Sequence, residues 1–313
     1  MLCPVACVGS GLIGRSWAMV FARAGHEVRL WDAQPEAARA ARDFCAQMLP
    51  ELEKRGLIDI PAPEALKLVR PVATLEEALD GALHVQESTF EDIAVKRKIF
   101  ATLDALAGPE TVLASSSSAL LPSAISEGLE GRRRVMVNHP INPSYLVPAA
   151  ELVPAPWTDK ALLERTADML RQAGMKPIVM EREIDGFVMN RMQGALLHEA
   201  FRLVAGGYAS AADVDIGIRE GLALRWSFMG PFETIDLNAP GGVRDYVERY
   251  AGIYDDMAEQ PAADWRGTVL DRIEADRRAV LPKENLAERQ AWRDRQLMAL
   301  AAHKRRAAEE IGE

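Results

Sequence analysis

A glycine-rich hexapeptide near the start of the chain restricts the fold more than any other feature of the sequence. Residues 9–14 read GSGLIG, between the apolar run PVACV and a segment with helical spacing that ends at Gly25. The next apolar run, HEVRLWD, ends at Asp32. Strand, glycine turn, helix, strand and acid in this order predict a β-α-β unit that binds a dinucleotide.

Each part of this motif has a physical role. Gly9 permits the tight turn, Gly11 lets the backbone approach a pyrophosphate, and Gly14 lets helix and strand pack closely. The helix N-terminus offers free N–H groups to the phosphates. Asp32 accepts from the ribose hydroxyls and repels a 2′-phosphate, so we expect NAD. The motif assigns these residues to the cofactor: Gly9, Gly11, Leu12, Ile13, Gly14 and Asp32.

Two alternatives to this interpretation remain at the sequence level. A glycine turn in an unrelated α/β fold produces the same hexapeptide, although strand, helix and acid are all in register here. Arg39 and Arg42 follow the acid and would favour NADP if they faced the cofactor. We expect them on a solvated helix face instead.

Strands and helices alternate up to about residue 185, which predicts an α/β fold with a mostly parallel, Rossmann-type sheet. A long helix over 35–56 is expected to be interrupted or kinked near Pro50. Beyond 185 the pattern is helical, with Ser210 as an N-cap. We therefore predict an NAD-binding domain over 1–185 and an all-helical domain over 186–313. The charged last helix is expected on the surface or against its own domain.

Composition excludes several classes of protein. The formal net charge is −9, which argues against a nucleic-acid partner. The three cysteines are too few and too unevenly placed for a disulfide framework or a zinc site, so we expect no metal. No apolar run reaches the length of a membrane span, and no leader pattern opens the chain, so we expect a cytoplasmic protein that does not associate with a membrane.

Four polar features carry the predicted chemistry: the serine run 115–118, His139, Glu151 and Asn190. Oxidation of a secondary alcohol needs a base for the hydroxyl proton and polar donors for the developing carbonyl. Histidine suits the base because its ordinary pKa lies near neutral, and a carboxylate on its other ring nitrogen would hold the tautomer. Small neutral side chains suit contacts to the substrate oxygen.

These residues resemble the 3-hydroxyacyl-CoA dehydrogenase superfamily, and most closely its lambda-crystallin and L-gulonate 3-dehydrogenase branch. The similarity extends over nearly the whole chain, in VGSGLIGRSWAMVFARAG, HVQESTFEDIAVKRKIF, SSSSALLPS, NHPINPSYLVPAAELVP, DGFVMNRMQGALLHEAFRLV and GLALRWSFMGPFETIDLN. The resemblance implies a Rossmann-type domain, a helical substrate and dimerisation domain over 186–313, and a homodimer.

The resemblance also implies roles for single residues. His139 is the general base and Glu151 its partner. Ser118 lies beside substrate and nicotinamide ribose, and Asn190 orients substrate and histidine. The residues implied near the cofactor are Asn142, Glu91 and Lys96. The chain departs from many members in having serines before Ser118, and Pro140-Ile141 after the histidine.

The prediction of the substrate rests mainly on Arg225. The gulonate branch has an arginine here, and a guanidinium can bind a carboxylate bidentately. We therefore expect oxidation of the 3-hydroxyl of a small, L-gulonate-like hydroxy acid to the 3-keto acid, with an L-3-hydroxyacyl-CoA such as 3-hydroxybutyryl-CoA as the alternative substrate. The alternative role for Arg225 is an interhelix ion pair with Glu220 or Glu233. A crystallin-like structural protein that only binds NAD is the alternative of another class. The other histidines are expected to be structural or on the surface: His26, His84, His198 and His303.

Overall fold

An eight-stranded sheet organises the first part of the chain in the computed structural model, which describes residues 2–258 and 267–312. The strands are β1 (Val5–Val8), β2 (Val28–Trp31), β3 (Val69–Pro71), β4 (His84–Glu87), β5 (Val112–Ser115), β6 (Val135–Pro140), β7 (Ala149–Pro154) and β8 (Lys176–Val179). Their order is β3-β2-β1-β4-β5-β6-β7-β8, and β6 pairs antiparallel with β7 while the other neighbours pair parallel. The predicted Rossmann-type α/β fold is confirmed.

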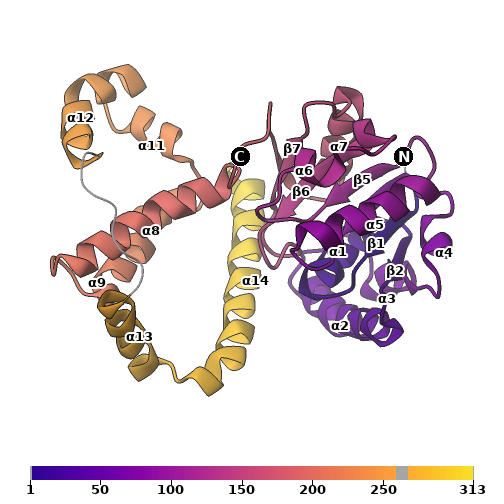
Figure 1. The fold of residues 1–313 in the computed structure, drawn as a ribbon. Helices are drawn as coiled ribbons and strands as arrows, with labels where there is room; N and C mark the ends of the chain where they lie inside the picture. The colour runs from indigo at the N-terminus through magenta and orange to yellow at the C-terminus, as the bar shows by residue number, and fades with distance from the viewer. Residues whose placement is uncertain (1, 259–266, 313) are drawn as a thin grey trace. The chain divides into compact units, whose positions relative to one another are not determined.

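Helices cover both faces of this sheet (Figure 1). They are α1 (Leu12–Arg23), α2 (Pro35–Lys54), α3 (Ala62–Lys67), α4 (Leu75–Leu79), α5 (Ile93–Leu106), α6 (Pro122–Ser126), α7 (Lys160–Gln172) and α14 (Leu286–Ile311). Along β1, Val5 and Cys7 join one apolar cluster, and Ala6 and Val8 join the other. Burial of both faces explains why the strands are continuous apolar runs.

Local sequence sets where the helices begin and end. Asp92 caps α5 by accepting from the Ala94 and Val95 N–H groups, and Gly25 ends the turn after α1 at φ +89°. The predicted interruption of the second helix is wrong, because α2 continues through Pro50 to Lys54. Leu49 and Leu52 are fully buried and hold that stretch against the core despite the missing N–H.

The chain divides into two compact units, residues 1–189 with 288–313, and residues 190–287. The predicted division placed the last helix, α14, in the second domain, whereas residues 288–313 pack with the first unit. Met298 of α14 is buried in the core of that unit, and the Arg305 guanidinium reaches the Gly56 carbonyl at 2.8 Å and Asp59 at 2.6 Å. The charge of α14 indicates an exposed helix, but its short apolar stripe does not specify which unit it packs against.

The second unit is helical in its described part. It contains α8 from Asn190 onward (Met189–Ala205), α9 (Ala211–Ile216), a π-helical segment (Gly217–Leu222), α10 (Ala223–Trp226), α11 (Pro231–Leu237), α12 (Gly242–Ala258) and α13 (Thr268–Val280). Ser210 caps α9 by accepting from the Asp213 N–H, as predicted. In the ranges that the structure describes, no helix is both long and apolar enough to cross a membrane.

Candidate active site

The carboxyl ends of four adjacent strands meet at one edge of the sheet. Val8 of β1 is in register with Glu87 of β4, Glu87 with Ser115 of β5, and Ser115 with Val137 of β6. The glycine loop and the loop after Glu87 therefore follow strands at this edge, the serine run begins with the last residue of β5, and His139 lies near the end of β6. Open α/β sheets bind ligands there.

The glycine loop leaves space only at its centre. Gly9 has φ +92°, and a Cβ on it would lie 2.8 Å from the Ser88 backbone. A Cβ on Gly14 would lie 1.8 Å from the Gly9 oxygen, which excludes any side chain. Gly11 is exposed, and its Cβ would meet nothing within 4 Å, so the loop presents open backbone at the start of α1. This is the cradle that a pyrophosphate requires.

Asp32 lies just after β2, where an acid that reads a ribose is expected. Its carboxylate accepts from the backbone N–H of Ser10 at 2.7 Å and of Gln34 at 3.0 Å, which fixes it beside the glycine loop. The two arginines that would favour NADP have other partners, since Arg39 pairs with Glu36 and Arg42 donates to the Val69 carbonyl. The residues present fit NAD.

His139 and Glu151 face each other across the antiparallel strands β6 and β7. His139 Nδ1 and Glu151 Oε2 are 2.6 Å apart, and both side chains are buried. Glu151 Oε1 accepts from the N–H groups of Val188 at 2.6 Å and Met189 at 2.8 Å, where α8 begins. The carboxylate thus has partners on both oxygens. The sequence pattern does not predict this hairpin register, or the two backbone donors at the junction with α8.

The surroundings of Glu151 keep it ionised. Burial disfavours the charged form, but the hydrogen bonds from His139 and from the Met189 and Val188 N–H groups together lower the pKa of Glu151 below its ordinary value. An ionised carboxylate only accepts, so the Nδ1 proton stays on His139. The lone pair is then on Nε2, which makes Nε2 the basic atom of the site.

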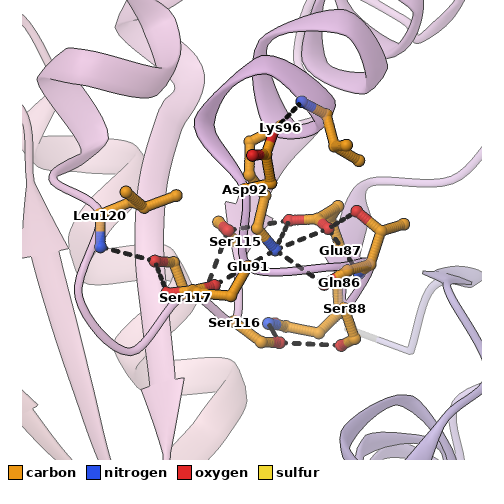
Figure 2. A network of polar contacts seen from close by, with 12 residues as sticks. Gln86, Glu87, Ser88, Glu91, Asp92, Lys96, Ser115, Ser116, Ser117 and Leu120 are labelled. Atoms are coloured by element: carbon orange, nitrogen blue, oxygen red, sulfur yellow. Dashed lines mark hydrogen bonds and ion pairs between the residues drawn. The ribbon is translucent and has the colours of Figure 1, made fainter.

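Glu87 is a buried hub that the sequence analysis missed. Its carboxylate lies 2.9 Å from the Lys96 ammonium through both oxygens, accepts from Ser115 Oγ at 2.8 Å, and accepts from the Thr89 N–H and hydroxyl at 2.6 Å (Figure 2). Lys96 is only 1% exposed, so its ammonium points to Glu87 rather than to the surface. A carboxylate ending a buried strand, nine residues before a lysine, was the available signal.

Glu91 links this hub to the serine run. Its Oε1 accepts from Ser117 Oγ at 2.5 Å (Figure 2). The same oxygen accepts from the N–H groups of Ser118 at 2.8 Å and Ala119 at 3.1 Å. Glu91 Oε2 is 3.8 Å from the Lys96 ammonium. The backbone at Ser118 is therefore fixed, while its side chain is exposed at the sheet edge. The three predicted residues Glu91, Lys96 and Ser118 belong to one network.

The remaining predicted residues are placed as follows. Asn142 is exposed in the loop after β6, joined to Pro143 by a cis peptide bond. Asn190 directly follows Met189 in α8. Arg225 lies in α10 of the second unit and is not among the residues that the first unit brings together. In the described chain it forms no ion pair with Glu220 or Glu233; Glu220 pairs with Arg219 instead.

A second polar chain supports the strand that carries His139. Asn138 donates to Gln86 Oε1 at 2.8 Å, and Gln86 donates to Ser116 Oγ at 2.7 Å. His84 Nε2 contacts the same Gln86 oxygen at 3.2 Å, and burial lowers the pKa of His84 to about 4. The structural role predicted for His84 agrees with this neutral, buried position.

Both parts of the chain match family models of one group of dehydrogenases. Residues 4–184 match the family model of the 3-hydroxyacyl-CoA dehydrogenase NAD binding domain, and residues 186–273 match that of its C-terminal domain. The chain belongs to the 3-hydroxyacyl-CoA dehydrogenase family. The matched NAD binding domain contains the glycine loop and Asp32, and the cofactor is NAD.

Individual relatives cover nearly the whole chain. A lambda-crystallin homolog of Bos taurus is 43% identical over 95% of this chain and 94% of its own length. An L-carnitine dehydrogenase of Pseudomonas sp is 34% identical over 94% of this chain and 92% of its own length. The solved structure of 5-formyl-3-hydroxy-2-methylpyridine 4-carboxylic acid 5-dehydrogenase, an NAD+-dependent dismutase, is 26% identical, with a TM-score of 0.84 over 100% of both chains. The predicted lambda-crystallin branch is confirmed.

Proposed function

We propose that this protein oxidises the hydroxyl group of a small, L-gulonate-like hydroxy acid to the keto acid with NAD. The observation that carries the proposal is the buried His139–Glu151 pair on the paired strands β6 and β7, with His139 near the end of β6 at the same sheet edge as the glycine loop. A base held in one tautomer is what removal of an alcohol proton needs.

In the proposed mechanism, His139 Nε2 takes the hydroxyl proton while Nδ1 keeps its bond to Glu151. The ionised carboxylate stabilises the imidazolium that forms. NAD held at the glycine loop and Asp32 would supply the acceptor for the hydride from the carbon that bears the hydroxyl. One proton and one hydride leave, so the alcohol becomes a ketone. Ser118 and Asn190 are proposed to donate to the substrate oxygen.

Arg225 is proposed to bind the substrate carboxylate. Its lack of an ion pair with Glu220 or Glu233 supports this role, and so does the name of one group of relatives, since L-carnitine is itself a 3-hydroxy acid. A carboxylate bound bidentately at a fixed distance from the reacting hydroxyl would select a free acid over a thioester.

The experiment is a panel assay of NADH formation with L-gulonate, L-carnitine, 3-hydroxybutyrate and 3-hydroxybutyryl-CoA. We expect turnover of a free acid, and Arg225→Leu should raise KM for that acid by at least about tenfold, because a bidentate charged contact is lost, while KM for NAD stays unchanged. Preferred turnover of the thioester would identify an acyl-CoA dehydrogenase instead. NAD binding without turnover of any of the four would favour the crystallin-like structural alternative.

A further inference from the structure

Phe187 has a backbone conformation that side chains rarely adopt. Among the described residues other than glycine, it alone has a positive φ, +49°, and it directly follows Gly186 at φ +76°. Its side chain is fully buried. A left-handed conformation favours glycine because a Cβ crowds the backbone, so a phenylalanine here is strained. Such strain persists where neighbouring contacts hold it, most often at functional sites.

The phenyl ring of Phe187 packs on the catalytic histidine. The centroids of the Phe187 and His139 rings are 5.6 Å apart, and the ring planes meet at 54°. Phe187 also belongs to the apolar cluster that contains Val137 of β6 and Val153 of β7. The Phe187 side chain therefore contacts both the apolar core under β6 and β7 and the His139 imidazole.

The backbone after Phe187 serves the other half of the pair. Its N–H donates to the Ile184 carbonyl at 3.0 Å, which closes a turn. The next two residues, Val188 and Met189, donate both N–H groups to Glu151 Oε1. The turn therefore places the Phe187 ring against the His139 imidazole. It also directs two backbone N–H donors at the Glu151 carboxylate, which hydrogen-bonds the same imidazole.

We propose that Phe187 is a positioning residue for the dehydrogenase reaction, a role that rests on the proposed function. Its ring holds the plane of the His139 imidazole and excludes water from the Nδ1–Oε2 hydrogen bond. Its left-handed backbone aims the Val188 and Met189 N–H groups at Glu151. A glycine would adopt this φ without strain. The phenylalanine ring adds the contact with the imidazole, which a glycine cannot make.

Three variants separate the ring from the backbone. Phe187→Gly relieves the strain and removes the ring, Phe187→Leu keeps apolar volume without an aromatic face, and Phe187→Tyr keeps the ring. We expect kcat to fall about 10- to 100-fold in the glycine and leucine variants, because a misplaced base loses rate rather than affinity. KM for NAD should stay within about twofold, and Phe187→Tyr should restore most of kcat.

The matched control is Phe100→Leu in α5, because Phe100 is also fully buried in the same apolar cluster. It should lower the melting temperature about as much as Phe187→Leu does and leave kcat within about twofold, since core truncation alone costs stability. Equal losses of kcat in the two leucine variants would mean that Phe187 has only a structural role.

A proton NMR measurement tests the proposal without any substrate. The Nδ1 proton of His139 should give a slowly exchanging downfield resonance, identified by its absence in His139→Asn. It should persist in Phe187→Tyr and be lost through exchange with water in Phe187→Gly and Phe187→Leu. Wild-type kcat and an unchanged resonance in the last two variants would overturn the proposal, as would the lack of the resonance in the wild type. If no substrate turns over, the proposed function fails while the resonance still decides the role of Phe187.

Discussion

Glu151 and His139 show how a single side chain acquires its chemistry from its neighbours. The carboxylate is buried, which alone would favour its neutral form, yet one imidazole and two backbone N–H groups keep it ionised. In turn it holds the proton on Nδ1 and leaves the lone pair on Nε2, the atom that we propose as the base. The charge state of one residue therefore decides the tautomer of the other.

Replacing Glu151 with glutamine should reduce kcat by about 10²- to 10⁴-fold. The glutamine oxygen would accept from the Val188 and Met189 N–H groups, so its NH₂ would face His139 Nδ1. This reverses the tautomer and places the ring proton on Nε2, where the base is needed. Steady-state kinetics with a circular dichroism check of folding measures this. A kcat within threefold of wild type would contradict the assigned role.

The same substitution has a signature in the dependence of stability on pH. Because the pKa of Glu151 is lower in the folded protein, its charge stabilises the fold above the ordinary glutamate pKa of about 4.3. This stabilisation is lost as the pH falls through the folded-state pKa, and glutamine does not titrate. The free energy of unfolding of the wild type should therefore fall more steeply below that pH than that of Glu151→Gln, as measured by urea unfolding.

Gly11 and Gly14 differ in what an added methyl group would meet. Gly11→Ala should leave the melting temperature within about 2 °C, since its Cβ lies in open space, and should weaken NAD binding at least about tenfold by occupying the pyrophosphate approach. Gly14→Ala should unfold the domain, because its Cβ would overlap the Gly9 oxygen. Calorimetric titration with NAD and thermal unfolding distinguish the two. Wild-type affinity in Gly11→Ala would contradict the cradle.

At the scale of elements, the Glu87–Lys96 pair ties β4, α5 and the serine run into one rigid edge. Both charges are buried, so neither is tolerated alone. Lys96→Met should cost about 3–5 kcal/mol of the free energy of unfolding, because it leaves the Glu87 carboxylate without its cation. The double variant Glu87→Gln with Lys96→Met should recover much of that loss.

The control for this prediction is Lys98→Met, two residues along the same helix and exposed. It should change the free energy of unfolding by no more than about 0.5 kcal/mol. Urea unfolding of the four proteins provides the comparison. A loss in Lys96→Met no larger than that in Lys98→Met would show that the pair does not hold the edge together.

For the whole molecule, we propose a homodimer formed through the helical unit. Its helix α12 exposes Val243, Val247, Tyr250 and Tyr254, which recur at helical spacing along one face. An apolar stripe of this kind marks an association surface. Light scattering after gel filtration should give twice the chain mass, and Val247→Asp with Tyr250→Asp should give monomers. The control is Ile311→Asp, which changes an exposed apolar side chain of α14. A monomeric wild type would contradict the dimer.

The sequence by itself determined the cofactor-binding motif of this protein. The spacing of Gly9, Gly11, Gly14 and Asp32 reflects local sterics within one β-α-β unit, so it can be read without the rest of the fold. His139 and Glu151 were also named correctly as a pair. Their motif was recognised as a resemblance, since nothing local in the sequence states that residues twelve apart share a strand register.

Only the tertiary structure decided which partners the buried carboxylates Glu151 and Glu87 have, because these partners come from separate strands and helices. The antiparallel register of β6 and β7 places Glu151 opposite His139, and the start of α8 supplies its two backbone donors. Glu87 received its role from Lys96, Ser115 and Thr89, which three separate segments bring to one carboxylate. Burial and partners of a charged group are properties of packing, and packing joins residues whose separation along the chain carries no periodic signal.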